Sequence, residues 1–108
     1  MRVYISGEIT GKDKEEVFLK FAKSEELLRR NGYEISNPWK IGKKLQDLAD
    51  HEVTYEEYMK ADLRELKRCD LIYFIPNWCN STGCEIERQF AIENNIPELE
   101  IRRAARLW

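Results

Sequence analysis

The sequence predicts an α/β fold in which helices cross over between parallel strands. The strongest strand spans residues 70–75, and its near-continuous apolar character is typical of a central parallel strand buried on both faces. A short β-rich run at residues 2–6 opens the chain and is followed by Gly7 and Gly11. Strand-like and helix-like segments then alternate along the chain, which is the pattern of a parallel sheet with crossover helices.

The first half of the chain predicts a helix and a second strand after the opening loop. From about residue 13 to residue 31 apolar residues recur at helical spacing, and Gly32 supplies the C-terminal stop. Residues 33–36 form a short strand, which an Asn-Pro pair closes. Residues 39–53 are polar with scattered apolar positions, and we interpret them as a loop with a short helix.

The second half predicts two more helices and a last strand. Thr54 begins a helix that runs to about residue 68, and Glu57, three residues on, completes a capping box. After the strongest strand, a loop leads into a helix over about residues 82–94. Residues 97–101 are expected to add a fourth strand, and the basic tail a final helical turn.

Composition favours one globular domain, residues 1–108, and excludes several classes of partner. Hydrophobic residues make up 43% of the chain and charged residues 35%, which is ordinary for a globular protein. The net charge of −2 predicts no strong attraction to a nucleic acid polymer or to anionic lipid. The start is too polar for a secretion signal, and no stretch approaches a membrane span. We therefore expect a cytoplasmic protein.

The cysteine content gives no sign of a metal site. The three cysteines, Cys69, Cys79 and Cys84, cannot all pair within the chain, and we interpret them as free cytosolic thiols. A zinc site would need a fourth good ligand, and the lone His51 is remote in sequence. We expect no metal and no cofactor.

Two loops are expected to border a ligand-binding crevice. In an open parallel sheet, ligands bind outside the carboxyl ends of the strands where the strand order reverses. With the order 2-1-3-4, this point lies between the first and third strands, at residues 7–11 and 77–83. The second loop runs into a helix N-terminus that favours an anion such as phosphate, and Ser81 and Thr82 could add hydroxyl donors. Plain helix capping would explain the same residues.

Two carboxylates fall on the apolar faces of their predicted helices. On a helical wheel Asp62 lies between Tyr55 and Tyr58, and Glu87 lies near the middle of the packed face of the last helix. A buried carboxylate must be paired, hydrogen-bonded or protonated, so two beside a crevice suggest acid–base or nucleophilic work. A boundary residue that reaches solvent is the competing interpretation, because Glu25 also falls within an apolar stripe and has no obvious role.

Two aromatic residues adjoin the same crevice, and each has two interpretations. Tyr4 lies near the end of the first strand, where its hydroxyl could reach the site or where it could simply fill the core. Trp78 could form a wall for a flat ligand, or it could pack its loop down.

Several of these segments together resemble a known family. These segments are Tyr4-Ile5-Ser6-Gly7, Ile9-Thr10-Gly11, Asn37-Pro38, Tyr58 with Asp62-Leu63, Cys69-Asp70, and Pro76-Asn77-Trp78 through Ser81, Gly83 and Glu87. Their order and spacing resemble the small DUF4406-type family related to nucleoside 2-deoxyribosyltransferases and 2'-deoxynucleoside 5'-phosphate N-hydrolases. The resemblance extends to about Pro97 and implies a flavodoxin-like, Rossmann-like three-layer domain with a four- to five-stranded parallel sheet.

The resemblance also implies a role for each matching residue. Glu87 would match the nucleophilic glutamate, because it follows the loop serine by six residues and precedes an alanine by four, whereas Glu85 does not. Asp62 would match the aspartate that assists departure of the base, and Tyr4 the tyrosine that orients the glutamate. The implied substrate-binding residues are Gly7, packed against the substrate, Ser81 at a phosphate, and Ile9, Gly11, Trp78 and Gly83.

The function that follows is cleavage or transfer at the N-glycosidic bond of a (deoxy)nucleoside or nucleotide. The alternative is a non-catalytic module that binds or senses a nucleotide, favoured by Glu8, which stands where the family has a proline. A third interpretation is an interaction protein that uses residues 39–53 or the basic tail, with Arg102, Arg103 and Arg106. The expected partner is a small nucleoside or nucleotide, and the relatives imply a homodimer or a higher homo-oligomer.

Overall fold

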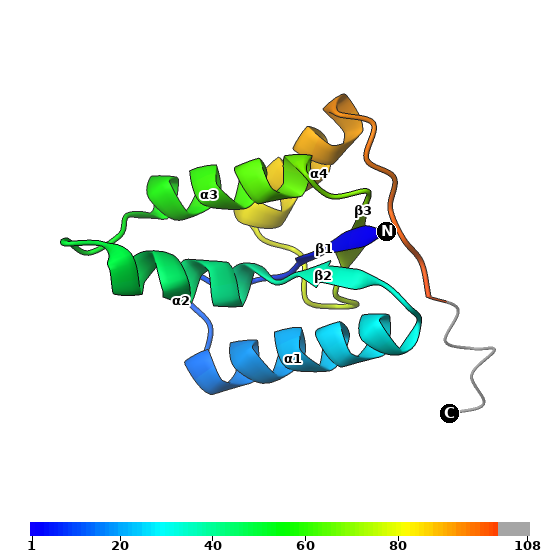
Figure 1. Cartoon of the computed structure of the whole chain (residues 1–108). Coiled ribbons are helices and arrows are strands. Elements are labelled where there is room, and N and C mark those ends of the chain that lie inside the picture. Colours follow the sequence, from blue (N-terminus) through cyan, green and yellow to red (C-terminus); the bar gives the residue numbers. More distant parts are fainter. Residues whose placement is uncertain (102–108) are drawn as a thin grey trace.

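The computed structural model describes residues 1–101 as a three-stranded parallel sheet with four helices (Figure 1). In chain order the elements are β1 (Arg2–Ser6), α1 (Lys14–Arg30), β2 (Glu34–Ser36), α2 (Pro38–Leu48), α3 (Tyr55–Lys67), β3 (Leu71–Phe74) and α4 (Thr82–Glu93). The strand order is β2-β1-β3, and both neighbours of β1 run parallel to it. The predicted α/β class, its parallel sheet and the order of the first three strands are confirmed.

The sheet is narrower than predicted, and its central strand is β1 rather than β3. On the outer side of β3, a single bridge joins Ile72 to Glu98, where the predicted fourth strand begins. The N–H of Ile72 donates to Pro97, and the N–H of Leu99 donates to Ile72. Pro97 itself has no N–H to donate to a ladder. A count of four or five strands is therefore not confirmed, and the predicted helical turn at Arg102, Arg103 and Arg106 lies outside the described residues.

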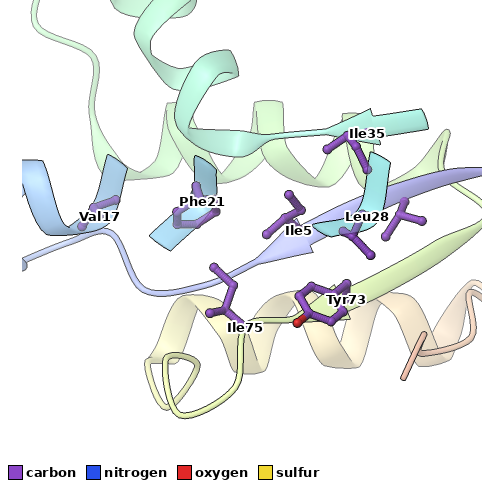
Figure 2. Close-up of a cluster of buried hydrophobic side chains, with 8 residues drawn as sticks. Ile5, Val17, Phe21, Leu28, Ile35, Tyr73 and Ile75 are labelled. Carbon is purple, nitrogen blue, oxygen red and sulfur yellow. The ribbon is translucent and has the colours of Figure 1, made fainter. Parts of the chain in front are cut away.

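Helices cover the two faces of the sheet in three layers, with α1 on one side and α3 and α4 on the other (Figure 1). Successive side chains of a strand point to opposite faces. Val3 and Ile5 of β1 therefore pack toward α1, whose buried residues include Phe21. Figure 2 shows this cluster, in which the labelled residues are Ile5, Val17, Phe21, Leu28, Ile35, Tyr73 and Ile75.

The other face of β1 carries two hydroxyl groups toward α3 and α4. Tyr4 belongs to the core cluster on that side, together with Leu66 of α3 and Ala91 of α4. Ser6 follows two residues later on the same face and is fully buried. This alternation places polar groups of the central strand against the start of α4.

Residues 38–48 form a helix of 11 residues, which corrects the interpretation of residues 39–53 as a loop with a short helix. The side chain of Asn37 accepts a hydrogen bond from the N–H of Trp39 at 3.0 Å, and Pro38 occupies the first turn. Asparagine before proline is a favourable helix start, because the cap satisfies a free N–H and proline is preset for the helix. Asn37 and Pro38, which follow the last residue of β2, therefore also begin α2.

The remaining helix ends agree with the prediction. Thr54 and Glu57 form the capping box of α3, and the Ser81 side chain caps α4 by accepting from the N–H of Cys84 at 3.2 Å. Gly32 has φ +88° just after α1, a left-handed conformation that glycine adopts without a steric penalty. Within residues 1–101 no helix is both long and apolar enough to cross a membrane.

A disulfide joins Cys79 to Cys84, which corrects the interpretation of all three cysteines as free thiols. Their Cα atoms are 5.6 Å apart, within the range that a disulfide spans. The cap at Ser81 turns the chain back on itself and brings the two cysteines together, although they are separated by only five positions in sequence. Cys69 is buried and free.

Candidate active site

A cavity of about 970 Å³ is bordered by the loops that follow β1 and β3 and by helices α2, α3 and α4. Four predicted substrate-binding residues line it, namely Gly7, Ile9, Ser81 and Gly83. Asp62 and Glu87 line it as well. The crevice expected from strand order is therefore present, and α2 adds a wall to it that was not expected from the sequence.

Glu87 lies in the second turn of α4 and is held at both carboxyl oxygens. The hydroxyl of Tyr4 donates to Oε2 at 2.6 Å, and the hydroxyl of Ser6 donates to Oε1 at 2.6 Å. The residue is only 5% exposed. Burial raises the pKa of Glu87 to about 7, although the hydrogen bonds from Ser6 and Tyr4 favour the charged form and limit the rise.

The side chain of Asp62 faces the same cavity from α3 and forms no hydrogen bond with another residue of the described range 1–101. It is 9% exposed. Burial, and then the negative charge of Glu87, raise the pKa of Asp62 to about 8. At neutral pH the Asp62 carboxyl therefore carries a proton that it can donate into the cavity.

Tyr4 lies beneath Glu87 rather than in the cavity wall. Its side chain is fully buried, and its pKa is raised well above the ordinary value by burial and by the charge of Glu87. The phenol therefore remains protonated and acts as a hydrogen-bond donor. As predicted, the Tyr4 hydroxyl extends toward the site, where it donates to Glu87.

Glu8 connects the two loops and does not line the cavity. Its carboxylate accepts from the N–H of Asn80 at 3.0 Å, and Lys12 lies 3.5 Å from its other oxygen. Its backbone exchanges a pair of bonds with Trp78, whose indole N–H donates to the Glu8 carbonyl while Glu8 N–H donates to the Trp78 carbonyl. The negative charge that distinguishes this first loop is thus directed at the second loop.

Trp78 and Gly11 lie away from the cavity lining. Trp78 packs against the core cluster under its loop, and Lys12 and Lys20 approach its ring to 5.4 and 5.0 Å. Gly11 occupies an exposed turn before α1. Gly7 is restricted by packing, because a Cβ there would lie 2.8 Å from Ile75 Cδ1.

Sequence reasoning missed Ser6 and the contribution of α2. Trp39, Lys43, Gln46 and Asp47 of that helix line the cavity. Gln46 also holds the α2–α3 connection, since its amide donates to the His51 carbonyl at 2.9 Å and accepts from the Val53 N–H at 3.0 Å. The Asn-Pro helix start was the available signal for α2.

Glu25, the third carboxylate on an apolar stripe, has a structural explanation. Asn37 Nδ2 donates to it at 3.0 Å, and Arg29 and Lys40 form ion pairs with it at 2.9 and 3.2 Å. Burial opposes ionisation, but these three hydrogen bonds outweigh it and lower the pKa of Glu25. Glu25 thereby ties α1 to the start of α2, outside the cavity lining.

Comparison with known proteins places the chain in a family and shows the fold it shares. Residues 1–97 match the model of DUF4406, described as a domain of unknown function. The chain belongs to the DUF4406 family. No curated protein matches this DUF4406 chain.

A solved structure similar to the DUF4406 chain is the 2-deoxyribosyltransferase from the psychrotolerant bacterium Bacillus psychrosaccharolyticus. The two share 18% sequence identity and superpose with a TM-score of 0.65. The match covers 96% of this chain and 79% of the other. The predicted relation to deoxyribosyltransferases is therefore confirmed at the level of the fold.

Proposed function

We propose that this DUF4406 chain cleaves or transfers the N-glycosidic bond of a (deoxy)nucleoside or nucleotide. The observation that carries the proposal is the pair of carboxyl groups in one cavity. Glu87 is fixed by two hydroxyl donors, whereas the side chain of Asp62 has no hydrogen bond within the described chain and carries a proton at neutral pH. Similarity to a solved 2-deoxyribosyltransferase supports the same class of substrate.

In the first step Glu87 attacks the anomeric carbon of the sugar. A lone pair of one carboxylate oxygen forms the new C–O bond while the C–N bond breaks and its electron pair passes to the base. Asp62 donates its proton to a ring nitrogen of the departing base. The product is a covalent sugar ester on Glu87, reached through an oxocarbenium-like transition state, as in retaining glycosidases.

In the second step a nucleophile resolves the ester. If water attacks, the product is the free sugar and the enzyme is a hydrolase. If a second base attacks, the product is a new nucleoside and the enzyme is a transferase. In both cases Glu87 leaves as a carboxylate, and the proton that the nucleophile loses returns to Asp62. The pair is then ready for another turnover.

The different environments of the two carboxyl groups suit these roles. The pKa of Glu87 is raised to about 7 and that of Asp62 to about 8. Between these values the charged nucleophile and the protonated acid coexist, as in other sites where surroundings separate two carboxyl groups. The hydroxyl donors favour the ionised form of Glu87, while burial and the charge of Glu87 favour the neutral form of Asp62.

The predicted substrate contacts are part of the same proposal. We infer that Gly7, Ile9, Ser81 and Gly83, which line the cavity, contact the substrate. The non-catalytic alternative remains the second candidate, and it predicts nucleotide binding without release of base; the Glu8 charge that favours it contacts Asn80 and Lys12. A homodimer or higher homo-oligomer and a cytoplasmic location stay predictions from the sequence.

The proposal is tested by incubating the protein with deoxynucleosides and with their 5'-monophosphates, each with and without a second free base. We expect release of free base or formation of a new nucleoside, detected by chromatography. Glu87→Gln should abolish either product, because an amide does not form the ester. Glu85→Gln is the matched control, since Glu85 lies two residues away with an exposed side chain. Base release that persists in Glu87→Gln would overturn the assignment.

A further inference from the structure

Ser6 ends the central strand with its hydroxyl directed at Glu87. The residue is fully buried, and its Oγ donates to Glu87 Oε1 at 2.6 Å. Tyr4, two residues earlier on the same face of β1, donates to Oε2 at 2.6 Å. One strand thus holds both oxygens of a carboxyl group that belongs to a helix on the adjacent layer.

The surroundings of Ser6 direct its single hydroxyl proton to Glu87. Its carbonyl accepts from the N–H of Ile75 at 3.0 Å, which fixes the end of β1 against the chain that leaves β3. Its Oγ also lies 3.3 Å from Cys79 Sγ. That sulfur is part of the disulfide and has no hydrogen to donate, and a carboxylate is a far better acceptor than a disulfide sulfur.

We propose that Ser6 is a positioning residue, which fixes the rotation of the Glu87 carboxyl group and favours its charged form. This inference rests on the proposed function, in which Glu87 is the nucleophile. The terminal torsion of a glutamate is broad, so a carboxyl group held by Tyr4 alone could rotate away from the line of attack. A second bond at the other oxygen removes that freedom, and attack depends on narrow limits of distance and direction.

The charge of Glu87 depends on groups from every element around the cavity. Tyr4 on β1 and Asp62 on α3 face it most directly, and both are neutral when Glu87 ionises. No charged residue of the described chain forms an ion pair with Glu87, so its hydrogen bonds carry the stabilisation of its charge. The other charged residues that line the cavity are Lys14 of α1 and Lys43 and Asp47 of α2.

Ser6→Ala tests the role of the hydroxyl with almost no change in volume. We expect kcat to fall about ten- to a hundredfold, as for loss of a hydrogen bond to a charged group, with KM within about twofold. The acid limb of the activity profile should move to higher pH, because the charged form of Glu87 loses a donor. Ser36→Ala is the matched control, since Ser36 is a buried serine at the end of β2 whose hydroxyl donates to Glu65 instead.

A titration without substrate separates this inference from the proposed function. The pKa of Glu87 can be read from its side-chain carboxyl carbon by NMR in the wild type, Ser6→Ala and Ser36→Ala. We expect an increase in Ser6→Ala alone. Ser6→Thr keeps the hydroxyl and should titrate like the wild type, which provides a second variant if the alanine form folds poorly.

The outcomes differ clearly. An unchanged Glu87 pKa together with an unchanged kcat in Ser6→Ala would overturn the role of Ser6. A fall in kcat that Ser36→Ala reproduces would also overturn it, because the effect would then be general to the sheet. A wild type that releases no base, combined with a raised pKa in Ser6→Ala, would overturn the proposed function and support the control of Glu87 by Ser6.

Discussion

Glu25 and Glu87 are two buried glutamates on apolar helix faces with opposite electrostatic surroundings. Glu25 is 9% exposed and Glu87 5%, so surface exposure alone does not distinguish them. Glu25 accepts from Asn37 and from the cations Arg29 and Lys40, and its pKa is lowered. Glu87 accepts only from neutral hydroxyls, and its pKa is raised. Burial opposes ionisation of both carboxyl groups, and only Glu25 has cationic partners that outweigh it.

Exchanging each glutamate for glutamine is the strongest test of this contrast. Glu87→Gln should lower base release by about a thousandfold or more, because the nucleophile is lost. Glu25→Gln should leave kcat unchanged and lower the free energy of unfolding by about 1 kcal/mol, since Arg29 and Lys40 lose a charged acceptor. Product chromatography and urea unfolding measure both quantities, and equal losses of activity would contradict the distinction.

Asp62→Asn tests the second carboxyl group of the cavity, which faces Glu87. The partners of Glu25 are an amide and two cations. We expect kcat/KM of the wild type to rise through about pH 7 and to fall through about pH 8, because activity needs Glu87 charged and Asp62 protonated. Asp62→Asn should lower kcat/KM by about a hundredfold or more and remove the fall at high pH. An alkaline limb that survives in Asp62→Asn would assign it to another group.

The cavity carboxyl groups, Asp62 and Glu87, and the structural carboxylate Glu25 should contribute to the free energy of unfolding with opposite dependence on pH. Asp62 and Glu87 have raised pKa values, so the folded state binds more protons than the unfolded chain between about pH 4 and about pH 8. The free energy of unfolding should therefore fall by several kcal/mol across that range, since each pKa unit corresponds to about 1.4 kcal/mol. Glu25 has a lowered pKa, so its contribution is present above the pKa of the unfolded chain and is lost on acidification.

Urea unfolding at a series of pH values measures these slopes. Asp62→Asn should flatten the fall between about pH 4 and about pH 8, and Glu25→Gln should reduce the loss of stability in acid. A wild-type stability that rises steadily to pH 8 would contradict the raised pKa values in the cavity.

Reduction of the disulfide should affect the Glu87 region and spare the Glu25 region. The bond between Cys79 and Cys84 encloses four residues that all line the cavity, and it contacts Ser6. Its loss should lower the free energy of unfolding by about 2 kcal/mol. Cys79→Ser with Cys84→Ser should reproduce the change and no longer respond to a reductant, whereas Cys69→Ser keeps the bond and should respond like the wild type. Unfolding with and without dithiothreitol is the measurement.

The elements that were predicted well have signals that are local in sequence. The capping box at Thr54, the stop at Gly32 and the buried run of β3 each depend on residues within a few positions of one another. The wheel positions of Asp62 and Glu87 were equally local, and both residues are buried on the faces expected. The same local signal could not tell Glu87 from Glu25.

The elements that were missed depend on contacts between distant segments. The disulfide requires the turn at Ser81, and the role of Glu8 requires residues 78–80 to lie beside the first loop. Ser6 meets Glu87 across 81 positions of sequence. The start of α2 is the exception, because Asn37 and Pro38 are adjacent and form a local helix signal that was interpreted only as a strand end.

Periodicity and helix caps predict the α/β class, most helix ends and the apolar wheel positions of Asp62 and Glu87, because these signals act within a few turns of chain. What the two carboxylates face depends on how distant segments pack together. Glu25 meets cations from α1 and α2, while Glu87 meets two hydroxyls from the central strand and a cavity shared with Asp62. Charge, hydrogen bonding and solvent access are properties of the space around a side chain, and that space is assembled from residues that the sequence keeps far apart.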